Sequence, residues 1–346
     1  MDHRPGRRPP VAAPAPGPAP PVTEPPATRP PGAGSPDASP PRPTDARHQA
    51  PDHAAPDHPA TRLPNDRKEP RTMSDAPAPF ELLPGAPDSP VLLHVPHSSR
   101  AVPADVRAGI VLGDAELERE LDHITDAHTD AIAAVAAASA GTTPWRFVNR
   151  LSRLVVDPER FPDEREEMLA VGMGAVYTRT THRAELRPAG FDPAPLVDRY
   201  FAPYAQAMTR AVEARLAATG HAVIVDVHSY PTAALPYELH GDGPRPPVCL
   251  GTDAFHTPPT LSAAARRAFA GFGGVGTDSP FAGTYVPLAH YGRDIRVSAL
   301  MVEIRRDLYM SEPGGPAGPG ARALGVALAA LVDAVTDEML RPGPAA

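Results

Sequence analysis

The chain has 346 residues, a formal net charge of −8 and a single cysteine, Cys249. The negative charge disfavours nucleic-acid binding, and one cysteine excludes an intrachain disulfide and fits a reducing compartment. No stretch approaches the roughly 20 consecutive apolar residues of a membrane span, and no secretory signal is recognisable, so we expect a cytoplasmic protein.

Residues 1–72 hold 21 of the 49 prolines and almost no aliphatic or aromatic residues. Such a segment buries too little apolar surface to offset its ordering entropy, which predicts a disordered, partly polyproline II arm. Met73 resembles an alternative translation start, and the rival interpretation is an arm that binds a polyproline-reading module. The length of residues 80–340 fits one large α/β domain or two small ones, and we expect a single domain.

Strand-like and helix-like segments alternate after residue 90. The run VLLHV (91–95) is short and apolar, as is typical of a buried strand. Asp114 is expected to cap a single helix that continues to Gly141. The segments RFVNR and SRLVVD, which begin at residues 146 and 152, are expected to be extended.

The second half of the chain continues the alternation. Residues 196–220 predict an amphipathic helix that stops at Gly220, and AVIVDVHS (222–229) predicts a strand buried on both faces. Further strands are expected at 248–253 and 298–304, and further helices at 260–272 and 319–339. The pattern predicts an α/β fold with a mostly parallel or mixed sheet flanked by helices.

Polar residues stand where these strands end. His97 follows the first strand, and Asp226, His228 and Ser229 close the strand at 222–229. Ligands of such sheets gather at the carboxyl ends of the strands, and histidine and carboxylate are the usual ligands of a catalytic zinc. The structural alternative for each histidine is a hydrogen-bonded residue without a function.

Glu303 lies near the end of the apolar run SALMVEI (298–304). A carboxylate on a buried strand is unfavourable unless it is paired or used in chemistry. Pairing with Arg305 or Arg306 is the structural alternative to a catalytic role.

The segment DHITDAHTD supplies further carboxylates, of which Asp122 and Asp126 are four residues apart and share a helix face. Asp126 is a candidate third ligand, and a solvated acidic face is the alternative. Arg150, Arg153 and Arg160 follow, and a guanidinium group matches a carboxylate in bidentate geometry. No glycine-rich phosphate loop or nucleophile elbow appears, so nucleotide cofactors and serine hydrolysis have no support.

Seven segments together resemble the N-formylglutamate amidohydrolase family. They occur in the family's order and span about residues 90–310. PHSSRAVP (96–103) resembles the family's PHSG-type opening, TDAH (125–128) its TDWH-like element, and SRLVVDPER (152–160) its SRYVVDLNR-like element. DVHS (226–229) resembles its D-X-H-S strand end, and VCLGTD (248–253) its V-L-G-D turn. FAGTYVPLAHYG (281–292) resembles its FxGGY…HYG stretch, and LMVEIRRDLYM (300–310) its LQLE…YM ending.

The resemblance implies a zinc-peptidase-like α/β fold, an amidohydrolase of histidine catabolism, and a substrate that is a small carboxylate. It implies a zinc or other divalent ion on His97, Asp126 and His228, where TDAH favours Asp126 over Asp122. It also implies that Glu303 is the general base, and that Arg153 and Arg160 hold the substrate carboxylate or polarise the scissile carbonyl. Ser229 and Tyr285 are expected to bind the substrate.

Three departures leave the substrate open. Glu159 stands where the family has asparagine, Ser99 where it prefers a small residue or glycine, and Thr284 at the second glycine of FxGGY. The expected reaction is hydrolysis of N-formyl-L-glutamate to formate and glutamate. The alternatives are a related amidohydrolase for another N-acyl amino acid or small peptide, and a non-catalytic binding protein of the same fold.

Overall fold

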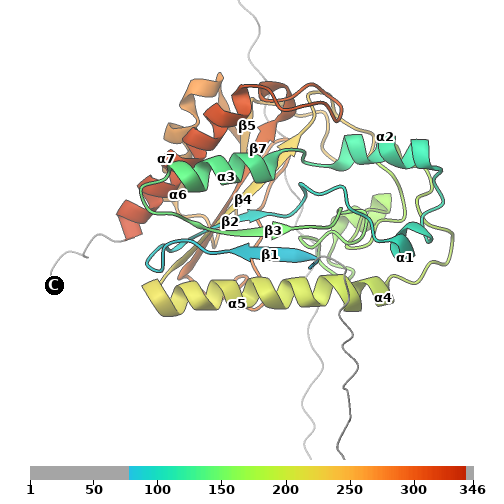
Figure 1. The fold of residues 1–346 in the computed structure, drawn as a ribbon, viewed down its shortest axis with the longest axis horizontal. Coiled ribbons are helices and arrows are strands. Elements are labelled where there is room, and N and C mark those ends of the chain that lie inside the picture. Colours follow the sequence, from blue (N-terminus) through green and yellow to red (C-terminus); the bar gives the residue numbers. More distant parts are fainter. Residues whose placement is uncertain (1–77, 340–346) are drawn as a thin grey trace, which may run out of the picture. The chain divides into compact units, whose positions relative to one another are not determined.

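The computed structural model describes residues 78–339, so the predicted arm over residues 1–72 lies outside the described part of the chain. Seven strands form one mixed sheet in the order β1-β3-β2-β4-β7-β5-β6 (Figure 1). The strands are β1 (Phe80–Leu83), β2 (Val91–Val95), β3 (Trp145–Asn149), β4 (Ala222–Tyr230), β5 (Val248–Gly251), β6 (Val275–Thr277) and β7 (Val297–Arg305). The predicted α/β fold with a mostly parallel or mixed sheet is confirmed.

Helices cover both faces of this sheet. The α-helices of the described residues are α1 (Ala104–Arg107), α2 (Asp114–Ile124), α3 (Thr129–Ser139), α4 (Ala194–Leu196), α5 (Ala202–Thr219), α6 (Pro259–Ala268) and α7 (Gly320–Met339). Helices α3, α6 and α7 pack on one face and α5 on the other (Figure 1). None of the described helices is long and apolar enough to cross a membrane.

The centre of the sheet is parallel. Strands β3, β2, β4 and β7 run in the same direction, whereas β1 is antiparallel to β3, and β5 is antiparallel to β7. All of β2 and β4 is buried, and so is β7 except its last residue. This burial on both faces explains the near-continuous apolar runs from which these strands were predicted.

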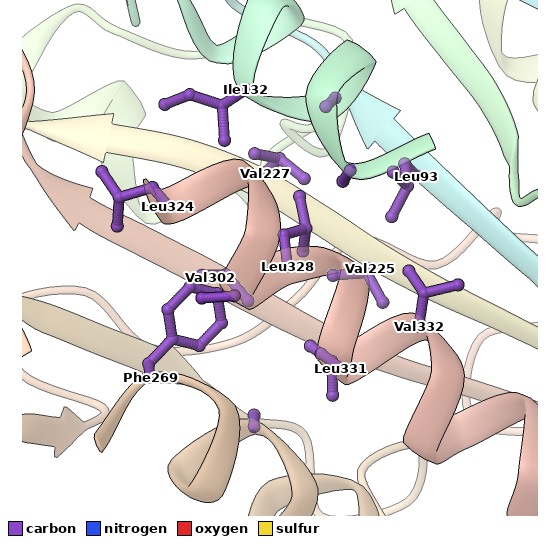
Figure 2. Close-up of a cluster of buried hydrophobic side chains, with 14 of the residues drawn as sticks. Leu93, Ile132, Val225, Val227, Phe269, Val302, Leu324, Leu328, Leu331 and Val332 are labelled. Carbon is purple, nitrogen blue, oxygen red and sulfur yellow. The ribbon is translucent and has the colours of Figure 1, made fainter. Parts of the chain in front are cut away.

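The larger core lies between the sheet and α7. Figure 2 shows Val225 and Val227 of β4 and Val302 of β7 facing leucines of α7, among them Leu328. Successive residues of a strand point to opposite faces, so Asp226 and His228 lie on the other face, the one covered by α5. The sheet therefore delivers two polar side chains to the α5 side at the carboxyl end of its central strand.

The predicted single helix from Asp114 to Gly141 is wrong, because residues 125–128 separate α2 from α3. At the break, the N–H of Asp126 donates to the carbonyl oxygen of His97 at 3.0 Å, and His128 has the left-handed φ of 67°. The hydrogen bond of Asp126 to His97, just after β2, thus replaces a helical hydrogen bond at this point. This contact brings Asp126 to the edge of the sheet.

Two smaller expectations also differ from the structure. Asp114 does not cap α2 but is its first residue, and the carboxylate of Glu116 accepts the N–H of Gly113 at 2.9 Å. The segment SRLVVD, expected to be extended, forms turns. The predicted stop at Gly220 is confirmed, with a φ of 79°.

Candidate metal centre and active site

A cavity of about 550 Å³ opens at the carboxyl ends of the central strands. The side chains that line it come from β4, β7, the start of α5, the break between α2 and α3, and the segments around residues 153–167 and 281–291. All eight residues predicted for the site line this one cavity: His97, Asp126, Arg153, Arg160, His228, Ser229, Tyr285 and Glu303. The structure tests their position and leaves their roles as predictions.

Three ligand-type atoms converge in the cavity. The Nδ1 atom of His97 lies 3.3 Å from Nδ1 of His228. Oδ2 of Asp126 lies 3.1 Å from Nδ1 of His228 and 3.6 Å from Nδ1 of His97. Two ligands of a tetrahedral zinc with bonds of about 2.0–2.1 Å are about 3.3 Å apart. The spacing of these three atoms therefore fits one face of a tetrahedral metal site.

The outer nitrogens of both histidines face carboxylates. Nε2–H of His97 donates to Asp157 at 3.0 Å, and Nε2–H of His228 lies 3.2 Å from both Asp226 and Glu159. These partners fix the tautomers and leave both Nδ1 lone pairs directed at the common point. This arrangement of donors suits a divalent cation.

Asp126, rather than Asp122, belongs to this group. Asp122 forms an ion pair with Arg100 at 2.7 Å, whereas the second oxygen of Asp126 accepts from Arg306 at 3.1 Å. Arg306 also donates to the carbonyl oxygen of His123 at 2.7 Å. The guanidinium group thus holds the Asp126 carboxylate in place from behind.

The local charges favour a cation between the histidines. Burial lowers the pKa of His228, but the carboxylates of Glu159 and Asp226 outweigh it and hold that pKa well above its usual value. Burial raises the pKa of Asp126, but hydrogen bonds to His228 and His97 outweigh it and keep the group ionised. The surrounding carboxylates therefore stabilise positive charge at this point of the cavity.

Glu303 stands opposite His228 in the register of β4 and β7, so both side chains leave the same face of the sheet. Its Oε2 atom is buried and has no hydrogen-bond partner among the described residues. Arg305 pairs with Asp307 at 2.8 Å, and Arg306 pairs with Asp126 at 3.1 Å, so neither neutralises Glu303 by direct contact. Burial is the main cause that raises its pKa to about 7, a suitable value for a general base.

Arg153 and Arg160 flank the carboxylate of Asp157. Arg153 donates to it at 2.7 Å and to the hydroxyl of Tyr177 at 2.9 Å. Nε of Arg160 is 3.4 Å from the same carboxylate, and that nitrogen has no hydrogen-bond partner in the described residues. Arg150, the third arginine considered from the sequence, instead pairs with Glu81 at 2.6 Å and does not line the cavity.

Ser229 and Tyr285 are held by residues of the same network. The hydroxyl of Ser229 accepts from Nε of Arg306 at 3.3 Å. The N–H of Tyr285 donates to Asp226 at 3.2 Å, and its ring centroid lies 4.8 Å from that of His94. Both side chains line the cavity, which is compatible with the substrate-binding role predicted for them.

Sequence reasoning missed a chain of hydrogen bonds behind His228. The hydroxyl of Tyr204 in α5 donates to Nε2 of His94 at 2.6 Å, and Nδ1–H of His94 donates to Asp226 at 2.7 Å. Asp226 in turn faces Nε2 of His228. The signal was present, because a histidine inside the apolar run VLLHV is also unfavourable unless it has a hydrogen-bond partner.

Asp157 and Arg306 were also missed as members of the site. Asp157 was not singled out in the sequence, yet it is fully buried and orients His97. Arg306 was considered only as a partner for Glu303. Their roles depend on contacts between distant segments, which no local pattern indicates.

Comparison with known proteins identifies a family and two similar structures. The family model described as N-formylglutamate amidohydrolase matches residues 89–310. The crystal structure of N-formylglutamate amidohydrolase from Ralstonia eutropha JMP134 is similar over 76% of this chain and 98% of that chain, with a TM-score of 0.64 and 26% identity. A gene product of Agrobacterium tumefaciens shares the fold over 75% of this chain and 94% of that chain, with a TM-score of 0.52 and 18% identity.

No curated protein matches the chain. The family model nevertheless spans well over half of the sequence and includes every residue that the structure brings together at the candidate metal centre. The chain belongs to the N-formylglutamate amidohydrolase family.

Proposed function

We propose that this chain is a metal-dependent amidohydrolase that cleaves the amide bond of a small N-acyl amino acid. The observation that carries the proposal is the convergence of His97, Asp126 and His228 beside the unpartnered carboxylate of Glu303 in one cavity. N-formyl-L-glutamate, which would give formate and glutamate, is the substrate suggested by the family.

His97 and His228, through Nδ1, and Asp126, through Oδ2, would hold the metal, and zinc fits this mixture of donors. When bound, a divalent cation supplies Lewis acidity, which polarises the scissile carbonyl and lowers the pKa of water. Asp157 and Asp226 keep both imidazole rings oriented by accepting their Nε2–H groups.

Glu303 is the proposed general base. Its carboxylate takes a proton from the attacking water as the new C–O bond forms, and delivers that proton to the nitrogen as the C–N bond breaks. Arg153 and Arg160 retain nitrogens that can bind the substrate carboxylate or the developing oxyanion. Ser229 and Tyr285 complete the wall of the substrate site.

A related hydrolase for another N-acyl amino acid or small peptide is the second candidate. The observation that favours it is Glu159, whose partly buried carboxylate lies 3.2 Å from Nε2 of His228. Burial and Asp226 raise the pKa of Glu159, because the cavity already contains other carboxylates. A substrate with two negative charges meets less favourable electrostatics there than a substrate with one.

The test is metal content and product release with the full-length protein. We expect about one zinc per chain and formate release from N-formyl amino acids. His228→Ala should lose both, whereas His221→Ala, a control at an exposed histidine, should keep both. Retention of metal and activity by His228→Ala would contradict the ligand assignment, and a wild-type protein that binds no metal would favour the non-catalytic alternative.

A further inference from the structure

The cavity is rich in carboxylates and poor in available cations. Seven carboxylate side chains line it: Asp126, Glu159, Glu166, Glu167, Asp226, Asp253 and Glu303. Four guanidinium groups face them: Arg153, Arg160, Arg165 and Arg306. Residues 78–339 contain no lysine, so any further positive charge would have to come from a histidine or a bound cation.

One of the four guanidinium groups is fully committed, and a second is largely exposed to solvent. All three nitrogens of Arg306 donate to protein oxygens, with Ser229 Oγ at 3.3 Å, the carbonyl of His123 at 2.7 Å and Asp126 at 3.1 Å. Arg165 forms two hydrogen bonds with Asp163, at 2.7 and 2.6 Å. Arg306 is therefore not available to a substrate without breaking existing contacts, and the charge of Arg165 is paired with Asp163 and screened by solvent, because its side chain is 57% exposed.

The remaining pair, Arg153 and Arg160, lies at one place in the cavity, because both flank Asp157. This pair can receive one carboxylate of a substrate. The other candidate at the cavity wall is His123, and burial and the neighbouring His182 lower its pKa, so it offers no positive charge at neutral pH. The paired arginines therefore offer the best place for one carboxylate, and a second carboxylate would meet the excess of acidic side chains.

The mouth of the same cavity is apolar. The rings of Phe161 and Tyr291 meet edge to face at 6.0 Å, and Leu288 and Tyr291 are 43% and 38% exposed. Val286, from the same segment, and Phe201, beside α5, add buried apolar surface to the wall. Large apolar side chains exposed inside a binding cavity are suited to cover an apolar part of a ligand.

The size of the cavity agrees with this chemistry. About 550 Å³ falls in the range of about 300–1,000 Å³ that is typical of sites for larger small molecules. N-formylglutamate, with about a dozen non-hydrogen atoms, is a small ligand for such a site. From the charges, the mouth and the volume, we infer that the substrate carries one carboxylate and one bulky apolar group instead of the two carboxylates of N-formylglutamate. This inference rests on the proposed amidohydrolase function.

The apolar group can belong to the amino acid or to the acyl part, and three substrates of the zinc-loaded, full-length protein distinguish the cases. They are N-formyl-L-phenylalanine, N-benzoylglycine and N-formyl-L-glutamate. We expect kcat/KM for one of the first two to exceed that for N-formyl-L-glutamate about tenfold or more, since apolar contacts discriminate at this level. The better of the two identifies which part of the substrate meets the apolar mouth.

Preference for N-formyl-L-glutamate would overturn the inference and leave the amidohydrolase function intact. Hydrolysis of none of the three by protein that has bound zinc would overturn both. The two failures are therefore distinct.

A pair of variants tests the position of the apolar site. We compare kcat/KM for the better apolar substrate with kcat/KM for N-formyl-L-glutamate. Leu288→Ala should lower the ratio of these two values about tenfold, because it removes apolar contact surface at the mouth. Ile295→Ala is the matched control, because Ile295 is 73% exposed and does not line the cavity. An unchanged ratio in Leu288→Ala, or equal changes in both variants, would contradict the inference.

Discussion

Replacement of Glu303 by glutamine should abolish activity and at the same time stabilise the metal-free protein at high pH. The carboxylate of Glu303 is buried, and its pKa is raised to about 7 from an ordinary value of 4.5, with burial as the main cause. A raised carboxyl pKa means that the folded state prefers the protonated form. The stabilisation from that proton is present below about pH 4.5 and is lost as the pH rises through about 7.

The size of the effect follows from these two pKa values. At 1.36 kcal/mol per pKa unit, the loss approaches about 3 kcal/mol above pH 7, and the part between pH 5 and pH 8 is about 2.5 kcal/mol. Glutamine cannot ionise, so Glu303→Gln avoids this loss. The Tm of the variant minus the Tm of the wild type should therefore be about 5–10 °C larger at pH 8 than at pH 5 for a domain of this size.

The assay is thermal unfolding of both proteins in EDTA at pH 5 and pH 8, with kcat measured in zinc. We expect kcat of Glu303→Gln to fall about 10²- to 10⁴-fold, as for removal of a general base. In the wild type, kcat/KM should rise with pH, and the midpoint of this rise should lie no higher than about pH 7. The reason is that a bound metal ion near Glu303 favours the ionised form of its carboxylate. A variant that is active, or whose relative stability is the same at both pH values, would refute this reasoning.

Two further substitutions test the surroundings of the site. Tyr204→Phe removes the hydroxyl that donates to His94 at 2.6 Å and should weaken zinc affinity about 10- to 100-fold in a competition titration, whereas Tyr200→Phe, which removes a buried hydroxyl without a partner, should not. Equal affinities in the two variants would show that the hydrogen-bond chain does not orient the ligands. Arg160→Ala should raise KM for N-acyl amino acids about tenfold or more with a smaller change in kcat, and the control Arg150→Ala should leave KM unchanged. A KM that is insensitive to Arg160 would move the carboxylate site elsewhere.

The central strands could be predicted because their environment is uniform. β4 and β7 are buried on both faces, and this burial produces the apolar runs that were recognised in the sequence. The edge strands β1 and β6 were not predicted, since each is short and only partly buried. Their pairing depends on neighbours that are distant in sequence.

The candidate site shows the same limit. His228 and Glu303 could be singled out because each interrupts an apolar strand, and the structure places them side by side. The helix break at residues 125–128 has no such signal, since the local pattern remains helical and the break follows from the contact of Asp126 with His97. The cavity-lining segment at residues 281–291 carries no periodic pattern, so the sequence does not indicate that its apolar side chains line the cavity.

In the proposed function, the groups for the reaction lie on the strands of the sheet, and the groups that select the substrate lie on a loop. His94 lies opposite Asp226, and His228 lies opposite Glu303, so a backbone ladder with a strand spacing of about 4.8 Å sets the distances between these groups. The apolar mouth, in contrast, is built on the loop that carries Leu288. Substitutions in that loop can accumulate without moving the sheet-borne groups, so related chains with this fold can diverge in substrate while they keep one reaction.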